Sequence, residues 1–517
     1  MAISAEQTQQ ASSSLPVVDM NAETVRHRAS GAVLSLVVRR IIHQAISFTG
    51  GVCLARMLSP AVFGVFTTVT YVVNFFGFFG DIGFGATLVQ RKEPPTEKLL
   101  RTVFAMQQGL MTVLVLLVFV AAPFFTRKYH MSDSSVWLFR ALSLSLFLTS
   151  MKVIPTIQLE RKIDFRKIVI PELAEVFVFQ SVAVTMAYLH YGVWSLVCAT
   201  VARGAVGFVI FFILAPWKMG FAFDRKMARD LLTFGAPFQL VQFFWLIRSA
   251  AIPLFGGALC GVQAVGYLNW AWGLSLLPYG VIEIVNRVVF PVCSRVQNDR
   301  EALGRNIGKY VRMAALGVFP LACVMMAVVP WAVEYVYKPK WMPAVPSLYF
   351  FMLATMASPI MNVYSRAFYA LRMVKTAAKL TGIYVITGWI LNVPLVLAYG
   401  YTGIAVSGFL VGLICIWLPI REMNKIVRVP VLECVWAPLV ASIISLAITR
   451  WVAMMFISGV VTLVAVTLFG FAVFAAALAL LQGRVILSEI SSFMAAAKNS
   501  GAAVTEVGGE GMAADGI

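Results

Sequence analysis

Long apolar segments recur along nearly the whole chain, and short polar connections separate them. A helix needs roughly 20 apolar residues to cross about 30 Å of hydrocarbon, so each segment predicts one membrane span. We expect about fourteen spans, with centres near residues 45, 75, 112, 145, 180, 203, 242, 277, 322, 355, 389, 411, 441 and 467. The pattern therefore predicts an all-α polytopic membrane protein.

Composition agrees with this prediction and excludes other classes of protein. Of the 517 residues, 60% are hydrophobic and 12% are charged. Soluble proteins are about 45–50% apolar and about 25% charged, which argues against an isolated soluble enzyme. The seven cysteines and four histidines are scattered without metal-ligand spacing, so the sequence predicts no metal site, disulfide framework or cofactor.

The net charge of +18 has two readings, a nucleic-acid surface or basic residues held in cytoplasmic loops. If the N-terminus is inside, 28 of the 41 Lys and Arg residues fall in inside segments, six in outside loops and seven within spans. This alternation indicates a multi-pass membrane protein with both termini in the cytoplasm and no nucleic-acid partner. Residues 1–30 contain no apolar run, so we expect no cleavable signal peptide.

Three weak similarities at nearly the same offset indicate an internal repeat. Gly64 pairs with Gly266, the segment 159–168 with 371–380, and Gly192 with Gly403. Each copy would hold six helices in the same orientation, and chance similarity between apolar helices stays an alternative. The expected domains are a tail at 1–30, an N-lobe at 31–218, a C-lobe at 219–428, an extra helix pair at 429–482 and a cytoplasmic tail at 483–517.

Three motifs, LARMLSPAVFGVF, GDIGFGATLVQRKEPPTEKLLRTVF and QLERKIDFRKI, carry a resemblance to a known family. They resemble the polysaccharide-transporter branch of the multidrug/oligosaccharidyl-lipid/polysaccharide (MOP) flippase superfamily, including its Wzx-type and colanic-acid-exporter-like members. The resemblance implies a V-shaped pair of six-helix bundles with alternating access. It also implies an isoprenoid-diphosphate-linked oligosaccharide, of undecaprenyl diphosphate type, as cargo. Its expected partners are membrane lipids and polysaccharide polymerase or export proteins.

Charges at bilayer depth are costly and usually face a cavity or a partner. Arginine suits a diphosphate because its fork matches phosphate oxygens and stays protonated. Snorkelling and interhelical ion pairs are the alternatives, and we favour snorkelling for Lys152 and Arg287. The predicted substrate-binding residues are Arg39, Arg40, Arg248, Arg203, Arg140 and Gln242.

Two acidic residues, Glu283 and Asp81, are candidates for ion coupling. Glu283 shares a predicted helical stripe with Trp272 and Arg287, and pairing with Arg287 is the alternative. For Asp81 a structural role is favoured. Glu172 and Glu175 follow Pro171 and are expected to complement the dipole at the start of a helix.

Aromatic residues are expected to serve two purposes. Trp194, Trp217, Trp331 and Trp341 lie near predicted helix ends, where interfacial anchoring explains them. Trp245, Trp270 and Trp272 are candidates for sugar stacking.

Three functions are compatible with such a chain. The leading hypothesis is a flippase that moves lipid-linked oligosaccharides across the inner membrane for exopolysaccharide, capsule or O-antigen synthesis. A cation-coupled small-molecule exporter would favour carboxylates over arginines in its cavity. A membrane polysaccharide polymerase or ligase would need a large outside loop with catalytic groups, which the sequence does not offer. We therefore expect a transporter that is not an enzyme.

Overall fold

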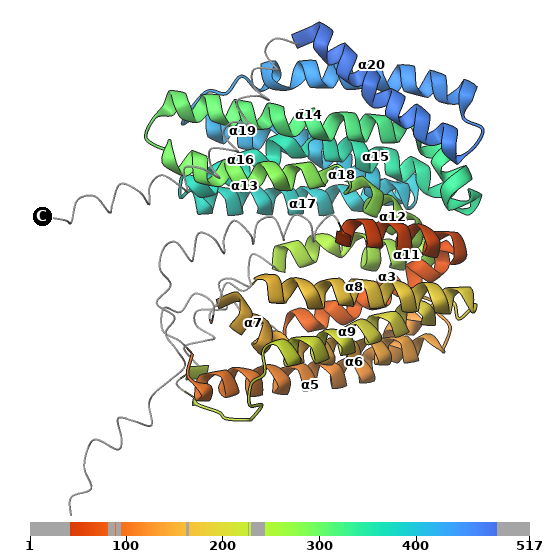
Figure 1. Ribbon diagram of the computed structural model, residues 1–517, viewed down its shortest axis with the longest axis vertical. Helices are drawn as coiled ribbons and strands as arrows, with labels where there is room; N and C mark the ends of the chain where they lie inside the picture. Colours follow the sequence, from red (N-terminus) through yellow and green to blue (C-terminus); the bar gives the residue numbers. More distant parts are fainter. Residues whose placement is uncertain are drawn as a thin grey trace, which may run out of the picture. The chain divides into compact units, whose positions relative to one another are not determined.

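The computed structural model describes residues 42–80, 88, 95–161, 165–225, 227–228 and 243–482. Apart from Ile42, these residues belong to one compact unit, His43–Ile486. They form helices and no strands, as the apolar pattern predicts (Figure 1).

Two bundles of helices follow each other along the chain. The N-terminal bundle contains helical residues 43–57, α3 (Pro60–Phe78), α5 (Glu97–Lys128), α6 (Ser135–Met151), α7 (Val153–Arg161), α8 (Phe165–Tyr188) and α9 (Trp194–Leu214). The C-terminal bundle contains helical residues 243–249, η2 (Ala251–Gly256), α11 (Gly257–Cys260), α12 (Val262–Ser275), α13 (Tyr279–Arg295), α14 (Arg300–Ala332), η3 (Val333–Tyr337), η4 (Pro339–Ala344), α15 (Val345–Met356), α16 (Ser358–Ala370), α17 (Val374–Tyr399), α18 (Thr402–Cys415) and α19 (Trp417–Asn424). Two further helices, α20 (Val431–Phe456) and Val460–Gln482, complete the described chain.

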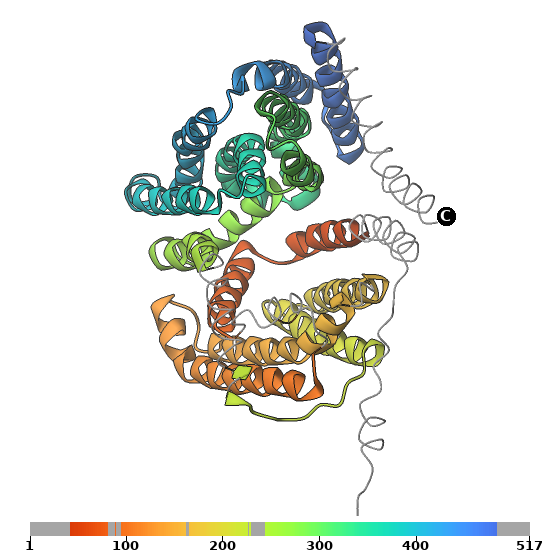
Figure 2. The same cartoon turned by 90° about the vertical axis from the view of Figure 1, so that its left-hand side faces the viewer.

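Within each bundle, consecutive helices pack side by side. In the N-terminal bundle α8 lies along α9, α9 along α6 and α6 along α5. In the C-terminal bundle α13 packs on α14 and α16, and α18 packs on α15 and α17. Helix α20 packs on α14. Figure 2 views these helices nearly end-on. The helix pair outside the predicted repeat therefore attaches to the C-terminal bundle.

Eleven described helices are long and apolar enough to cross a membrane, or up to thirteen spans if each of two bent helix pairs counts as one. The first predicted span, near residue 45, is described only from residue 42 onward. Each of the other predicted centres falls in or beside one of these helices or bent pairs. The outward faces are apolar, with Val120 82%, Leu397 76% and Leu480 88% exposed. Large apolar side chains exposed on several helices are expected where a protein faces lipid.

Both bent spans contain a proline at or next to the break. The α12–α13 pair bends by 49° around Pro278, and the pair formed by Pro339–Met356 and Ser358–Ala370 bends by 41° just before Pro359. Proline removes a backbone donor and disfavours helical geometry in the residue before it. These breaks matter because residues on either side of them no longer share one helical face.

The two longest helices begin at conventional caps. Thr96 accepts a hydrogen bond from the Leu99 amide at 3.3 Å at the start of α5, and Asp299 accepts one from Ala302 at 2.9 Å at the start of α14. The α5 helix also ends with Arg127 and Lys128. Caps and terminal charges of this kind compensate the unpaired backbone groups and the helix dipole.

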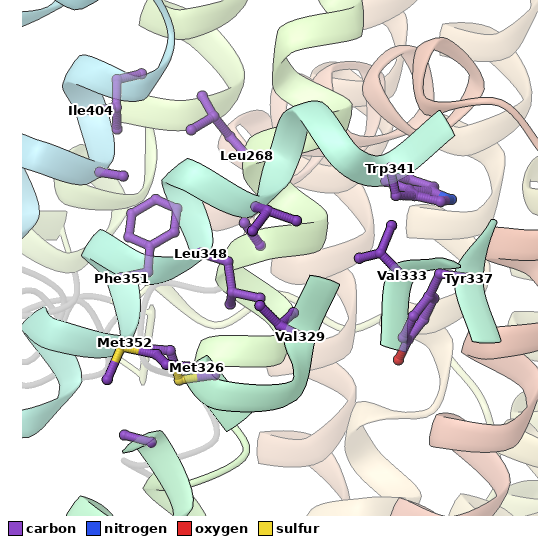
Figure 3. Close-up of a cluster of buried hydrophobic side chains, with 14 of the residues drawn as sticks. Leu268, Met326, Val329, Val333, Tyr337, Trp341, Leu348, Phe351, Met352 and Ile404 are labelled. Atoms are coloured by element: carbon purple, nitrogen blue, oxygen red, sulfur yellow. The ribbon is translucent and has the colours of Figure 1, made fainter. Parts of the chain in front are cut away.

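A large hydrophobic core lies in the C-terminal bundle and reaches the N-terminal bundle at Ala55. Leu268, Trp341, Phe351 and Met352 are each less than 4% exposed within it. Figure 3 shows side chains of this core from α12, η4 and α15, with Trp341 beside Val333 and Tyr337. Trp341 was expected to anchor at the membrane interface, and that prediction is wrong because its ring is fully buried and stacks on Trp270 at 5.3 Å.

Candidate functional site

A cavity of about 370 Å³ lies within the C-terminal bundle. That volume is within the usual range of small-molecule sites, about 300–1,000 Å³. Its described lining comes from eight helical segments and mixes aromatic, hydroxyl and amide side chains with apolar ones. The aromatic, hydroxyl, amide and charged lining residues are Trp245, Arg248, Trp272, Tyr279, Phe351, Thr355, Ser358, Asn362, Ser365, Phe368, Thr381 and Tyr384. Among the described lining residues, Arg248 alone carries a charge.

Arg248 is held between two aromatic rings. Its guanidinium carbon lies 4.7 Å from the centre of the Tyr384 ring and 5.1 Å from that of Trp245. Its Nη2 donates a hydrogen bond to the Tyr384 hydroxyl at 3.3 Å. Ring faces attract cations, so the two rings stabilise the charge within the membrane-spanning region. One hydrogen bond to Tyr384 leaves most of the five N–H donors of the guanidinium for a ligand.

A second polar group faces the same cavity. The Tyr279 hydroxyl donates to Asn362 Oδ1 at 2.8 Å, and Asn362 Nδ2 donates to the Ser358 carbonyl at 3.0 Å. These two hydrogen bonds fix the orientation of the Asn362 amide. Aromatic faces beside an amide and a guanidinium form a lining able to stack on sugar rings and to hydrogen-bond hydroxyl or phosphate oxygens.

The sequence identified part of this cavity and missed the rest. Arg248, Trp245 and Trp272 were predicted candidates and all three line it, whereas Trp270 packs in the core. Tyr384, Tyr279 and Asn362 were not predicted. Each has an uncharged polar side chain, and nothing in the chain order indicates that α13, α16 and α17 meet there.

Arg203 and two other charged residues form a cluster in the N-terminal bundle. Glu175, whose side chain is 4% exposed, accepts from Lys152 Nζ at 2.5 Å and from Arg203 Nε at 3.3 Å. Gly207 leaves room for the carboxylate, because a Cβ there would lie 2.0 Å from Glu175 Oε1. The Arg203 side chain remains 50% exposed. Arg203 is thus both paired and accessible.

Two predictions about this cluster are wrong. Lys152 does not snorkel, because it lies within the span Ser135–Arg161 and its side chain is 18% exposed beside Glu175. Glu175 is not at a helix start, because α8 begins at Phe165 and continues through Pro171. Compensation of buried charges by each other, rather than the helix dipole, therefore explains Glu175.

We expect Glu175→Gln to lower the free energy of unfolding by about 3 kcal/mol, because it leaves Lys152 and Arg203 without their counter-charge. Thermal unfolding in detergent measures the effect. Glu301→Gln is the matched control, since the Glu301–Arg305 pair has side chains 82% and 66% exposed, and exposed pairs contribute less than about 1 kcal/mol. Equal unfolding temperatures for both variants would contradict a structural role for the cluster.

Arg140 lies apart from the cavity, on α6. Its guanidinium carbon is 4.7 Å from the Trp137 ring centre and 5.7 Å from that of Phe119. Its buried Nε has no hydrogen-bond partner among the residues described here. The structure therefore does not bring Arg140, Arg203 and Arg248 together into one described cavity.

The predicted stripe containing Glu283 is not one helical face. Trp272 lies on α12 and Glu283 on α13, and the 49° bend around Pro278 separates them. Trp272 lines the cavity, whereas Glu283 is exposed and is not among its lining residues. Arg39, Arg40, Asp81 and Gln242 lie outside the described residues.

At one end of the helices, each bundle donates hydrogen bonds to carbonyls at a helix end of the other. Lys340 Nζ donates to the carbonyls of Arg56 at 3.0 Å and Leu58 at 2.6 Å, and Trp341 Nε1 donates to that of Ala55 at 2.8 Å. These carbonyls belong to the last turn of the first helix and the residue after it. The last carbonyls of a helix have no intrahelical partner, so these donors satisfy them.

Arg56 makes the reciprocal contact. Its Nη1 donates to the carbonyls of Tyr335 at 3.5 Å and Val336 at 3.3 Å, near the end of η3. Each bundle thus caps a helix end of the other. We call these five hydrogen bonds, made by Arg56, Lys340 and Trp341, the latch.

Beside the latch, α3 crosses α12 at the two glycines that the sequence repeat paired. A Cβ on Gly64 would lie 1.6 Å from the Val262 carbonyl oxygen, and one on Gly266 would lie 1.9 Å from that of Pro60. Two backbones can approach this closely only where both residues are glycine, which has no Cβ. The repeat predicted that Gly64 and Gly266 are equivalent positions, but it did not predict that the two helices contact each other there.

No group of three or more His, Cys, Asp or Glu residues suited to a metal occurs in the described ranges. The cavity itself is lined by the Arg248 guanidinium, aromatic rings, and amide and hydroxyl groups.

Comparison with solved structures gives the class of fold. The lipid II flippase MurJ in its inward closed conformation matches with a TM-score of 0.71 and 17% identity, over 88% of this chain and 99% of that one. An inward-facing multidrug resistance MATE family transporter of the MOP superfamily matches with a TM-score of 0.57 and 14% identity, over 76% and 98%. The apolar helices and these matches define a multi-pass membrane protein with the fold of these two solved structures.

Sequence relatives then give the family. The model of the polysaccharide biosynthesis protein family matches residues 53–346, more than half of the chain. The teichuronic acid biosynthesis protein TuaB of Bacillus subtilis is 28% identical over 54% of this chain and 59% of its own length. The succinoglycan biosynthesis transport protein ExoT of Rhizobium meliloti is 24% identical over 64% and 66%. The chain belongs to the polysaccharide biosynthesis protein family, and it spans about three fifths to two thirds of these curated relatives.

Proposed function

We propose that this protein is a flippase that moves isoprenoid-diphosphate-linked oligosaccharides across the bacterial inner membrane for synthesis of a surface polysaccharide. The observation that carries the proposal is the cavity around Arg248, which offers one positive charge among aromatic and amide groups. Membership in the polysaccharide biosynthesis protein family supports the same cargo class. The chain acts by binding and conformational change and carries out no covalent chemistry.

The cargo combines a charged diphosphate with neutral sugars, and the cavity has a group for each. The Arg248 guanidinium is proposed to bind phosphate oxygens, for which its forked donors are suited. Trp245 and Trp272 stack on sugar rings, and Asn362 hydrogen-bonds their hydroxyls. A diphosphate loses its hydration when it enters lipid, which is energetically costly. Binding to Arg248 compensates part of this cost and so lowers the barrier to crossing the membrane.

Alternating access requires the bundles to close at one end at a time. The latch and the Gly64–Gly266 crossing close the end that the basic-loop pattern assigns to the outside. Opening this end breaks the five capping hydrogen bonds, whose carbonyls then need other donors. Both termini are proposed to be cytoplasmic, and polysaccharide polymerase or export proteins are proposed partners that receive the cargo.

Further residues are proposed in supporting roles. Arg203 and Arg140, together with Arg39, Arg40 and Gln242 outside the described residues, are proposed to contact cargo along its path. Glu283 and Asp81 are proposed for ion coupling. The exporter alternative has less support, because a cationic drug would meet Arg248 as the charge in the described cavity.

Depletion of the protein tests the proposed function. We expect lipid-linked oligosaccharide units to accumulate in the cytoplasmic leaflet while total synthesis continues, because the precursor no longer crosses. Leaflet distribution is measured with a membrane-impermeant glycosidase on right-side-out and inside-out vesicles. Re-expression of the chain should restore the distribution. An unchanged distribution after depletion would contradict the proposal.

A further inference from the structure

A second cavity, of about 460 Å³, lies at the latch end beside the first helix. It is lined by residues from the end of that helix, the end of α8 and the turn after η3. These residues are Cys53, Arg56, Met57, Val184, Ala187, Tyr188, His190 and Lys338. Two are cationic, one is a histidine, and none of the described lining residues is acidic.

Basic residues gather at this cavity, although they are few in the other loops assigned to the same side of the membrane. Loops assigned to this side carry only six of the 41 basic residues. Arg56 and Lys338 nevertheless line one cavity, and Lys340 bonds to the Arg56 carbonyl next to it. A cationic hollow focuses electrostatic potential and attracts anions.

Lys338 occupies a backbone conformation that side chains rarely adopt. Its φ of 81° and ψ of 150° fall in a region used almost exclusively by glycine. His190 also has a left-handed φ of 63°. A lysine held at a glycine position costs conformational free energy, and such outliers concentrate at functional sites.

The basic side chains have donors to spare. Arg56 uses Nη1 for the latch, and its Nε and Nη2 make no hydrogen bond with a described residue. The Lys338 ammonium and the His190 ring make neither a hydrogen bond nor an ion pair within the described ranges. Met57, Val184 and Ala187 supply an apolar wall next to these donors.

We propose that Arg56, His190 and Lys338 form a binding site for the phosphate group of a membrane lipid. Arginine and lysine are the usual phosphate ligands, and the apolar wall accommodates the start of a lipid chain. The phosphate comes either from the diphosphate of the proposed cargo on leaving the protein or from an anionic phospholipid of the surrounding leaflet. The first source rests on the proposed function, and the second does not.

Cys53 lines this cavity and reports on its charge. The full chain in phosphatidylcholine nanodiscs is treated with the anionic reagent methanethiosulfonate ethylsulfonate or its cationic trimethylammonium analogue. Peptide mass spectrometry measures the rate at Cys53, normalised to a free thiol. We expect the anionic reagent to react at least about tenfold faster, because positive potential raises its local concentration. Equal rates would overturn the proposal.

Lys338→Gly is the decisive variant, because glycine relieves the backbone conformation while removing the charge. We expect it to fold at least as well as the parent and to lower the rate ratio by about fivefold. Arg372→Gly is the matched control, since Arg372 is also basic, exposed and left-handed, with a φ of 60°, but does not line the cavity. An unchanged ratio in Lys338→Gly would overturn the assignment.

Protection of Cys53 identifies the source of the phosphate. Slower labelling with undecaprenyl diphosphate in the nanodisc indicates the cargo, and slower labelling with phosphatidylglycerol indicates bulk lipid. Protection by neither lipid, or by soluble inorganic diphosphate alone, overturns a lipid site. The measurement needs no transport, so its failure leaves the proposed function standing, and failure of the proposed function leaves the phosphatidylglycerol result intact.

Discussion

Arg248→Ala is expected to lower polysaccharide export by about tenfold to hundredfold. A hydrogen bond to a charged group contributes about 1.5–3 kcal/mol, and the alanine removes both the charge and the donors from the cavity. Arg248→Lys keeps the charge but loses the fork and the stacking between Trp245 and Tyr384, so we expect an intermediate yield. Polymer yield and leaflet distribution of lipid-linked units measure the effect.

Arg305→Ala is the control for this experiment. Arg305 pairs with Glu301 on an exposed face of α14, and its side chain is 66% exposed. We expect parental export from this variant. Because Arg248→Ala must first reach the membrane, its level and unfolding temperature are compared with those of the control. Parental export from a well-inserted Arg248→Ala protein would remove Arg248 from the binding site.

Gly64→Ala is expected to force α3 and α12 apart. The added Cβ would lie 1.6 Å from the Val262 carbonyl oxygen, which is backbone and cannot rotate away. Overpacking of this kind costs about 1–3 kcal/mol, so the unfolding temperature should fall. The latch end should also open, and the distance between spin labels at the exposed positions Met57 and Leu259 should increase.

Gly273→Ala is the matched control on α12. No atom lies within 4 Å of a Cβ at Gly273, and alanine favours a helix over glycine, so we expect an unchanged or slightly higher unfolding temperature. The spin-label distance should stay at its parental value. A Gly64→Ala protein as stable and as closed as this control would show that the crossing is not what holds this end shut.

Much of the fold follows from local properties of the sequence. Apolar segments long enough to cross a bilayer predict helices directly, because the backbone within lipid must satisfy its own hydrogen bonds. The expected centres correspond to the helices described here. Where prediction failed, proline was often the cause: Pro278 divides the stripe that was expected to join Trp272 to Glu283, and Pro171 lies inside α8 rather than at its start.

The candidate site was predictable only in part. A charged residue within a predicted membrane span is a candidate functional residue, and this criterion selected Arg248, Arg203 and Arg140. The same signal cannot separate a cavity residue from a paired one. Arg203 meets Glu175 on another helix, whereas Arg248 meets Tyr384, far away in the chain.

The sequence by itself determined the class of this protein. Long apolar segments predict membrane helices, and the placement of basic residues favours one orientation. The family motifs indicate polysaccharide biosynthesis. Only the tertiary structure decided which side chains meet. It enclosed Arg248 with Tyr384 and Asn362, joined Lys152 to Glu175, and brought Gly64 against α12. Contacts between helices depend on crossing positions and bends, and these are set by packing between residues distant in sequence.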